Sequence, residues 1–272
     1  MSPLWSKSLT LYVDVEQLRL HLRPGWLQSR AASGQVLPPA GIQITSALAL
    51  PLHQALDALF IEMQQHTDIR NARLQVELAD AHVHFDVVQG DFAGYSEQQL
   101  QAIAQGCVAE LLGDAANSQQ LRWQLQPDGR HLLLCAIAEP MVGAVVQVAA
   151  QHGLRLYSMQ PIFCSHWNRH RSALSQGTGV FTLADAGHSL TVCARRGSIT
   201  ALSLGRWAAP AAGNGNAAQL AAQSLDQRVD RLLASLGAQT EALSSFVLVA
   251  RDPAALAVAA RWTVRDWEEQ RV

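Results

Sequence analysis

Two strand–turn–strand patterns, one in each half of the chain, constrain the fold more than any other feature. In the first, apolar residues alternate with polar ones along residues 9–13 and 18–22, on either side of a turn near Asp14. In the second, residues 180–185 and 189–194 flank a turn at Gly187-His188. Alternation with a period of two, broken by turn residues, predicts an antiparallel hairpin. We therefore predict a chain built as two similar halves, each with its own hairpin.

Strands and helices alternate through the rest of the chain, which predicts an α/β protein. Apolar residues recur at three- and four-residue spacing in the segments expected to be helical, namely 46–66, 96–113, 140–152, 161–174, 217–236 and 253–261. Strands are expected at 72–79, 82–88, 120–126, 131–138, 154–159, 199–204, 246–250 and 262–267. The segments 23–41 and 208–218 are rich in glycine, proline and alanine and are expected to be loops.

Composition excludes several classes of partner and location. The formal net charge is -2, so no basic excess is available for a nucleic-acid backbone. The chain shows neither a signal-peptide pattern at its start nor the roughly 18 apolar residues in a row that a membrane-spanning helix needs. We expect a soluble, cytoplasmic protein that reaches a membrane only through a partner.

Three segments resemble the actin-like ATPase superfamily. Residues 153–161 (GLRLYSMQP) resemble the family's strand and turn into a helix after an inserted subdomain. Residues 183–192 (LADAGHSLTV) resemble its second phosphate loop, in which aspartate-x-glycine lies between two strands. Residues 246–250 (FVLVA) resemble the strand before its adenosine-binding glycines. The specific likeness is to proteins that assemble type IV pili and type II secretion machinery, PilM and the cytoplasmic part of GspL, with FtsA as a more distant relative.

This resemblance implies an actin-like, ribonuclease-H-like fold that is duplicated and carries an inserted α+β subdomain. The first half would begin at residues 1–70. The inserted subdomain and its return strand would cover 71–160, and the second half would cover 161–272.

The resemblance also implies a set of nucleotide-binding candidates, and the chain departs from the family at two of the three loops. The second loop keeps Asp185, Gly187, His188 and Ser189. The first loop, at Asp14, has valine and glutamate where the family has a flexible glycine, which hinders close approach to a phosphate. The third reads Ala-Arg-Asp-Pro at 250–253 in place of paired glycines.

Each of these candidates has a structural alternative. Asp185 and Gly187, like Asp14, suit an ordinary turn, in which aspartate caps its own loop and glycine takes a positive φ. His166 and His170 share a helix face at four-residue spacing and could ligate a metal with Cys164, but a third well-spaced ligand is lacking, so a solvated helix face is the preferred interpretation.

The damaged loops favour a non-enzymatic protein without a resident cofactor. We expect a scaffold, a pseudo-ATPase, that docks the cytoplasmic segment of an inner-membrane pilus or secretion protein, and self-association is a further option. The alternatives are a weak ATPase that binds ATP and Mg²⁺ through Asp185, and a metal-binding module at His166 and His170.

Overall fold

The structure is a computed structural model that describes residues 7–23, 41–185, 187–207, 215–235, 243–250 and 262–266. It divides into two compact units. The first holds residues 1–83, 118–120 and 137–162, and the second holds residues 84–117, 121–136 and 163–272. Each unit is described by itself.

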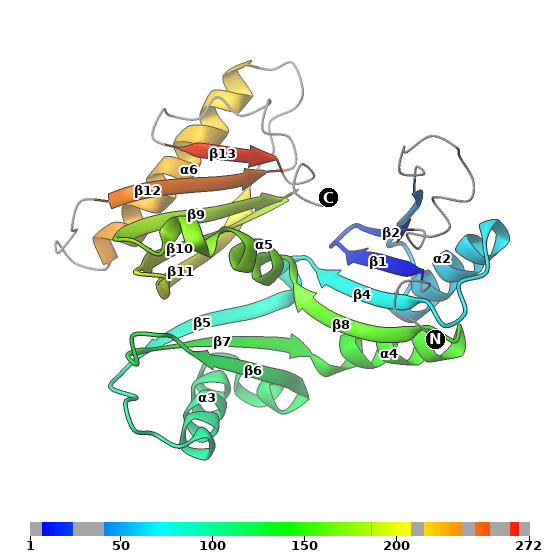
Figure 1. Cartoon of the computed structure of the whole chain (residues 1–272), viewed down its shortest axis with the longest axis horizontal. Helices are drawn as coiled ribbons and strands as arrows, with labels where there is room; N and C mark the ends of the chain where they lie inside the picture. The colour runs from blue at the N-terminus through cyan, green and yellow to red at the C-terminus, as the bar shows by residue number, and fades with distance from the viewer. Residues whose placement is uncertain are drawn as a thin grey trace. The chain divides into compact units, whose positions relative to one another are not determined.

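The first unit is built on a five-stranded sheet in the order β3-β2-β1-β4-β8 (Figure 1). Its strands are β1 (Ser8–Val13), β2 (Gln17–Arg23), β3 (Ile42–Ala47), β4 (Arg73–Leu78) and β8 (Arg155–Pro161). The β1–β2 and β2–β3 pairs are antiparallel, whereas β4 runs parallel to both β1 and β8. The central strand β1 is buried from its second residue onward, as a strand covered on both faces must be.

The second unit repeats this arrangement in the order β11-β10-β9-β12-β13. Its strands are β9 (Thr178–Asp185), β10 (Gly187–Arg195), β11 (Ser198–Trp207), β12 (Leu243–Ala250) and β13 (Thr263–Asp266). The first three strands are again antiparallel and the last two are parallel to the central strand β9. Strand order and direction match between the sheets, so the predicted duplication is confirmed.

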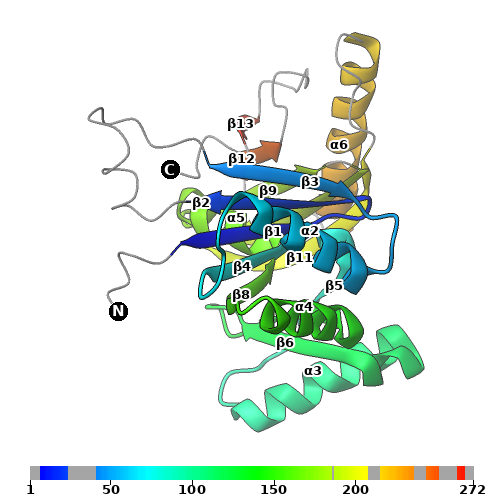
Figure 2. The same cartoon turned by 90° about the vertical axis from the view of Figure 1, so that its right-hand side faces the viewer.

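One helix pair covers the first sheet and one long helix packs on the second. Helices α2 (Leu52–His66) and α4 (Glu139–Gln151) lie side by side in the first unit, where α2 contacts β2 and β3 and α4 contacts β8 (Figure 2). Helix α6 (Gly215–Ser235) contributes Leu225 and Val229 to a core that also contains Val180 and Leu248. Helix α5 (Ile162–His170) and a short 3₁₀ segment, Arg171–Leu174, lead into β9.

The inserted segment forms a smaller layer of one helix on a three-stranded sheet. The sheet order is β5-β7-β6, made of β5 (Val83–Gln89), β6 (Gln119–Leu125) and β7 (His131–Ala138). Helix α3 (Glu97–Leu112) starts at a capping box in which Ser96 accepts from the Gln99 N–H and the Gln99 side chain accepts from the Ser96 N–H. It ends at Gly113, whose φ of 57° suits glycine, so both predicted helix limits are confirmed.

Three sequence expectations differ from the structure. Residues 42–47 form β3, and the helix expected at 46–66 begins only at Leu52, directly after Pro51. Strand β4, which falls inside the segment 71–160 expected to be inserted, belongs to the first sheet. Helix α6 begins at Gly215, inside the expected loop. The loop expected at 23–41 and the helix expected at 253–261 lie mostly or wholly outside the described residues.

A buried glutamine links the inserted hairpin to the second sheet. Gln126 directly follows β6, and its side-chain oxygen accepts a 3.0 Å hydrogen bond from the backbone N–H of Ile199 on β11. The pairing of β10 with β11 shifts register between Cys193 and Ala194, and Ala194 is paired with Ile199. The Gln126 side chain therefore bonds to the β11 backbone at the point where the regular pairing is interrupted. The side-chain amide of Gln126 also donates to the carbonyl of Gln124 at 3.3 Å.

We expect Gln126→Ala to lower the free energy of unfolding by about 1–3 kcal/mol, because it leaves the buried Ile199 N–H without its acceptor. Urea unfolding followed by circular dichroism measures this. Gln124→Ala, at an exposed position two residues away, is the matched control and should change stability by less than about 0.5 kcal/mol. Equal losses in the two variants would show that the Gln126–Ile199 bond contributes little.

Candidate functional site

At the tip of the hairpin after β1, the Asp14 side chain bonds to the backbone of its own turn. The Asp14 side chain is 5% exposed, and its Oδ1 accepts a 2.7 Å hydrogen bond from the Val15 N–H. The Asp14 N–H donates to the carbonyl of Gln17 at 2.9 Å. Val15 and Glu16 are exposed at the tip, so side chains stand where a phosphate would need open backbone. Side chains therefore occupy the tip of the first hairpin, and phosphate binding at Asp14 stays a prediction.

The hairpin tip after β9 has a different geometry. Asp185 and His188 are paired directly across it, and both are half-buried. Gly187 has a φ of 85°, a left-handed conformation that favours glycine. Among the described residues, leaving out its chain neighbours, a Cβ placed on Gly187 would meet no heavy atom within 4 Å. Phosphate binding at this tip stays a prediction.

Ser189, the remaining candidate in this segment, already has a structural partner. Its side chain is 1% exposed, and the Arg228 guanidinium on α6 hydrogen-bonds its hydroxyl. The same guanidinium donates to the carbonyl of Arg206 at 2.7 Å. A Cβ on Gly205 would lie 2.7 Å from the Arg228 Cζ, so a larger residue here would require the Arg228 side chain to move. Ser189 therefore helps hold α6 on the sheet.

The five predicted nucleotide-binding residues are thus divided between the units. Asp14 lies in the first unit, and Asp185, Gly187, His188 and Ser189 lie in the second. Of the third loop, only Ala250, the last residue of β12, is described.

The histidine pair on α5 is buried, and the expectation of a solvated helix face is wrong. His166 is 2% exposed and His170 is 9% exposed. Their rings stack with centroids 6.4 Å apart, and His170 also stacks on Phe181 at 5.9 Å. Phe181 in turn meets the Trp167 ring edge to face at 5.9 Å. The pair is part of an aromatic cluster between α5 and β9.

Metal ligation at this pair finds no additional support from its surroundings. Cys164 is half-buried near the start of α5. Across the ranges that the structure describes, no three histidine, cysteine, aspartate or glutamate side chains gather as a metal site would require.

The environment of His170 favours its neutral form. Burial lowers the pKa of His170, and the positive charges of Arg169 and Arg265 lower it further. A neutral ring suits stacking within an apolar cluster.

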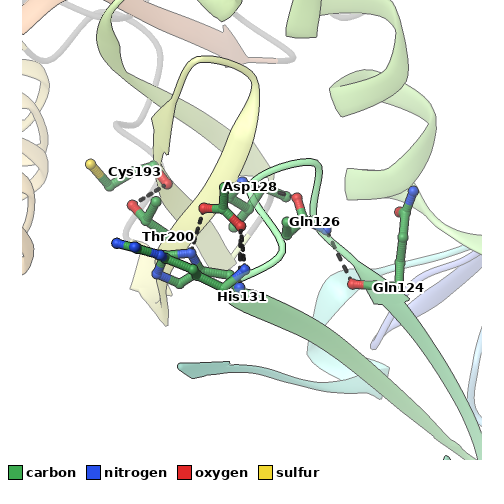
Figure 3. A network of polar contacts seen from close by, with 8 residues as sticks. Gln124, Gln126, Asp128, His131, Cys193 and Thr200 are labelled. Carbon is green, nitrogen blue, oxygen red and sulfur yellow. Dashed lines mark hydrogen bonds and ion pairs between the residues drawn. The ribbon is translucent and has the colours of Figure 1, made fainter. Parts of the chain in front are cut away.

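Sequence reasoning missed a polar cavity at the opposite end of β10 from Gly187. Its volume is about 900 Å³, and it is lined by the β6–β7 turn, the start of β9, the β10–β11 turn and the end of α6. Figure 3 shows Asp128 and His131 facing each other at this place, with Cys193 and Thr200 from β10 and β11 beside them. The signal available in the sequence is the pair Arg195-Arg196 directly before Gly197, a pattern that indicates a turn but not a cavity.

The Asp128 side chain in this cavity is held by contacts within its own turn. Its Oδ2 lies 2.6 Å from His131 Nδ1, and its Oδ1 accepts from the backbone N–H of Arg130 at 2.9 Å and of His131 at 3.2 Å. Burial acts to raise the pKa of Asp128, but these hydrogen bonds and the His131 ring outweigh it, so the pKa is lowered. Asp128 is therefore ionised at neutral pH.

The duplicated sheets, each with three antiparallel strands followed by two parallel ones, together with the inserted α+β layer, define the actin-like fold, which confirms the predicted fold class. Solved structures similar to this chain share that fold. A chain of a PilM–PilN type IV pilus biogenesis complex is 13% identical, with 95% of this chain and 88% of that chain covered and a TM-score of 0.65.

Two further structures resemble the chain. The cytoplasmic domain of EpsL, an inner-membrane component of the type II secretion system of Vibrio cholerae, is 13% identical, with 98% and 88% of the two chains covered and a TM-score of 0.51. A Bacteroides thetaiotaomicron protein with an actin-like ATPase fold and unknown function is 10% identical, with 92% and 84% covered and a TM-score of 0.50. No protein-family model matches the chain, and no curated protein matches it by sequence.

Within the part of the chain that the structure describes, no helix has both the length and the apolar character needed to cross a membrane.

The lowered pKa of His170 predicts that acid destabilises the second unit. Between the native pKa and the ordinary value of 6.5, the unfolded chain binds this proton more readily than the folded chain. The stability linked to His170 is therefore fully present above that ordinary value and is lost as the pH falls through the native pKa. We expect His170→Phe, which keeps the stacking on Phe181, to flatten the fall in melting temperature between about pH 7.5 and about pH 5.

His53→Phe is the matched control, because His53 is an exposed histidine on α2 in the first unit. Its melting temperature should follow the unmodified chain across the same range. An unchanged pH profile for His170→Phe would contradict a neutral, buried His170.

Proposed function

We propose that this chain is a non-enzymatic cytoplasmic scaffold of a type IV pilus or type II secretion-like machine. In this role it binds the cytoplasmic segment of an inner-membrane protein and is peripheral to the membrane through that partner. The observation that carries the proposal is the likeness to the PilM–PilN complex chain, which extends over 95% of this chain. The EpsL cytoplasmic domain, from a second machine of the inner membrane, supports the same class of role.

The state of the first hairpin supports binding over catalysis. The resemblance to actin-like ATPases implies a phosphate-binding turn in each half, and metal-assisted transfer needs well-placed acidic or polar groups. Asp14 directs its Oδ1 to the Val15 N–H, and the tip presents the valine and glutamate side chains. A protein in which side chains occupy one of these two turns is better suited to binding a partner than to hydrolysing ATP.

The outer edge of the first sheet offers a surface for an extended peptide. Strand β8 ends that sheet within the described residues and pairs with β4 on one side. Leu156 is 37% exposed and Tyr157 is 64% exposed, and the ladder shifts register at this place, so Tyr157 projects as an extra residue. An extended segment gains backbone hydrogen bonds along such an edge and specificity from the side chains beside it.

The β8 edge provides the first test. We expect Tyr157→Ala to weaken capture of the inner-membrane partner by about tenfold or more, as for an aromatic anchor of an interface. The measurement is affinity capture with the tagged full chain from detergent-solubilised membranes, with captured proteins identified by mass spectrometry. The expected protein is a membrane-anchored pilus or secretion component with a short cytoplasmic segment.

Tyr95→Ala is the matched control, because Tyr95 is also an exposed aromatic residue, on the loop before α3 in the other unit. It should leave capture unchanged. The proposal fails if the unmodified chain recovers no pilus or secretion protein. Equal capture by Tyr157→Ala and the unmodified chain would reject the β8 edge alone.

One observation favours a second candidate, a weak ATP-binding protein. Gly187 keeps the positive φ and the open space of a phosphate loop, with Asp185 directly beside it. In this alternative the backbone at Gly187 would receive a phosphate, and Asp185 would face the Mg²⁺ that accompanies it.

ATP binding predicts stabilisation by mass action. A ligand at a hundredfold excess over its dissociation constant stabilises the folded chain by about 2.7 kcal/mol. If ATP is the ligand, the melting temperature should rise with millimolar ATP and Mg²⁺, and Gly187→Val should lose that rise through its strained φ and its bulk. The scaffold proposal expects no rise. A rise that Gly187→Val abolishes would favour the second candidate.

A further inference from the structure

The polar cavity at the end of β10 has an excess of positive charge. We refer to it as the arginine cavity, after Arg130 on the β6–β7 turn and Arg195 and Arg196 on the β10–β11 turn, all of which are exposed. Among the described residues that line it, Asp128 is the one acidic side chain. The chain as a whole has a formal net charge of -2, so this concentration of arginine runs against the overall balance.

The acidic residue offsets at most one of the three arginine charges. Asp128 accepts hydrogen bonds from the backbone N–H groups of Arg130 and His131, and its other oxygen faces the His131 ring at 2.6 Å. Arg130 and the Arg195-Arg196 pair come from hairpins far apart in sequence and line one cavity, which leaves an excess of positive charge among the described lining residues.

The backbone of Arg196 is unusual for its residue type. Arg195 and Ser198 are paired, so Arg196 and Gly197 form a two-residue turn with φ values of 51° and 78°. Such a turn favours Asn-Gly, because both central residues take positive φ. The other non-glycine residue with positive φ in the described part of the chain is Asn71, which has the favoured type. An arginine held in this conformation is typical of a position where the side chain serves a purpose beyond the turn.

Neighbouring bonds hold the turn in place. The Arg196 N–H donates to the carbonyl of Gly177 at 2.7 Å, and the Gly197 N–H donates to that of Leu174 at 3.2 Å. Both acceptors precede β9, so the segment before the central strand fixes the turn. These hydrogen bonds fix the backbone that carries Arg196 at the cavity. A fixed backbone lowers the conformational entropy that is lost when a ligand binds.

We propose that the arginine cavity binds a phosphate-bearing small molecule. Guanidinium groups bind phosphate oxygens through paired, charge-assisted hydrogen bonds, and several of them suit a ligand with more than one negative charge. The volume of about 900 Å³ is within the range of small-molecule sites. The cavity lies at the opposite end of β10 from Gly187, so it is distinct from the predicted phosphate loop.

The test uses the full chain and inorganic pyrophosphate as the probe. Isothermal titration calorimetry is run at fixed ionic strength with EDTA present, so that metal-dependent binding is removed. We expect saturable binding to the unmodified chain and a loss of affinity of about tenfold or more in Arg195→Gln and in Arg196→Asn. Arg196→Asn is informative because asparagine suits the turn, so its melting temperature should be kept or raised while binding is lost.

The matched control is Arg122→Gln, at an exposed arginine on β6 that does not line the cavity. It should bind pyrophosphate as the unmodified chain does. Citrate, a polyanion without phosphate, should bind at least about tenfold more weakly than pyrophosphate if the site recognises phosphate.

Three outcomes would overturn the proposal. The unmodified chain could fail to bind pyrophosphate. The Arg195 and Arg196 variants could bind it unchanged, which would place binding elsewhere. Citrate could bind equally well, which would reject phosphate as the ligand class. None of these outcomes depends on partner capture through the β8 edge, so this proposal and the scaffold proposal are tested separately.

Discussion

The structure depends on one constraint, which is that each half has a central strand paired on both edges and buried on both faces. Strand β1 lies between an antiparallel β2 and a parallel β4, and β9 lies between an antiparallel β10 and a parallel β12. A strand in this position is mostly apolar and has no room for unpaired ionisable side chains in its interior, so a carboxylate is expected only at its end. Asp14 follows β1 and Asp185 ends β9, so the same constraint places an aspartate at the same point of both sheets.

The two halves differ in the residues and hydrogen bonds around this aspartate. At Asp14 the carboxylate is taken up by the next backbone N–H, and branched or charged side chains occupy the tip. At Asp185 a glycine with positive φ keeps the tip open, while the buried Ser189 that follows is bonded to Arg228 of α6. The two sheets therefore keep the same strand arrangement, whereas the hairpin tips at Asp14 and Asp185 differ.

The tertiary structure also changes how several polar residues are understood. His166 and His170 have the spacing of a solvated or metal-binding helix face, yet they lie in an aromatic cluster with Phe181 and Trp167. Arg130 and Arg195 belong to separate hairpins and look like unrelated surface residues in the sequence. The Gln126–Ile199 hydrogen bond joins those hairpins, and the two arginines line one cavity.

The sequence by itself determined the local elements: the hairpin in each half and the limits of α3 at Ser96 and Gly113. These follow from periodicity, capping and turn chemistry, which act over a few residues. It did not reveal β3, an edge strand in which Ile44 alone is buried and whose alternation is therefore weak. Nor did it show that β4 pairs with β1 in the first sheet. The tertiary structure decided the sheet partners, the burial of the histidines and the arginine cavity, because each depends on which distant segments share a surface and lose contact with water.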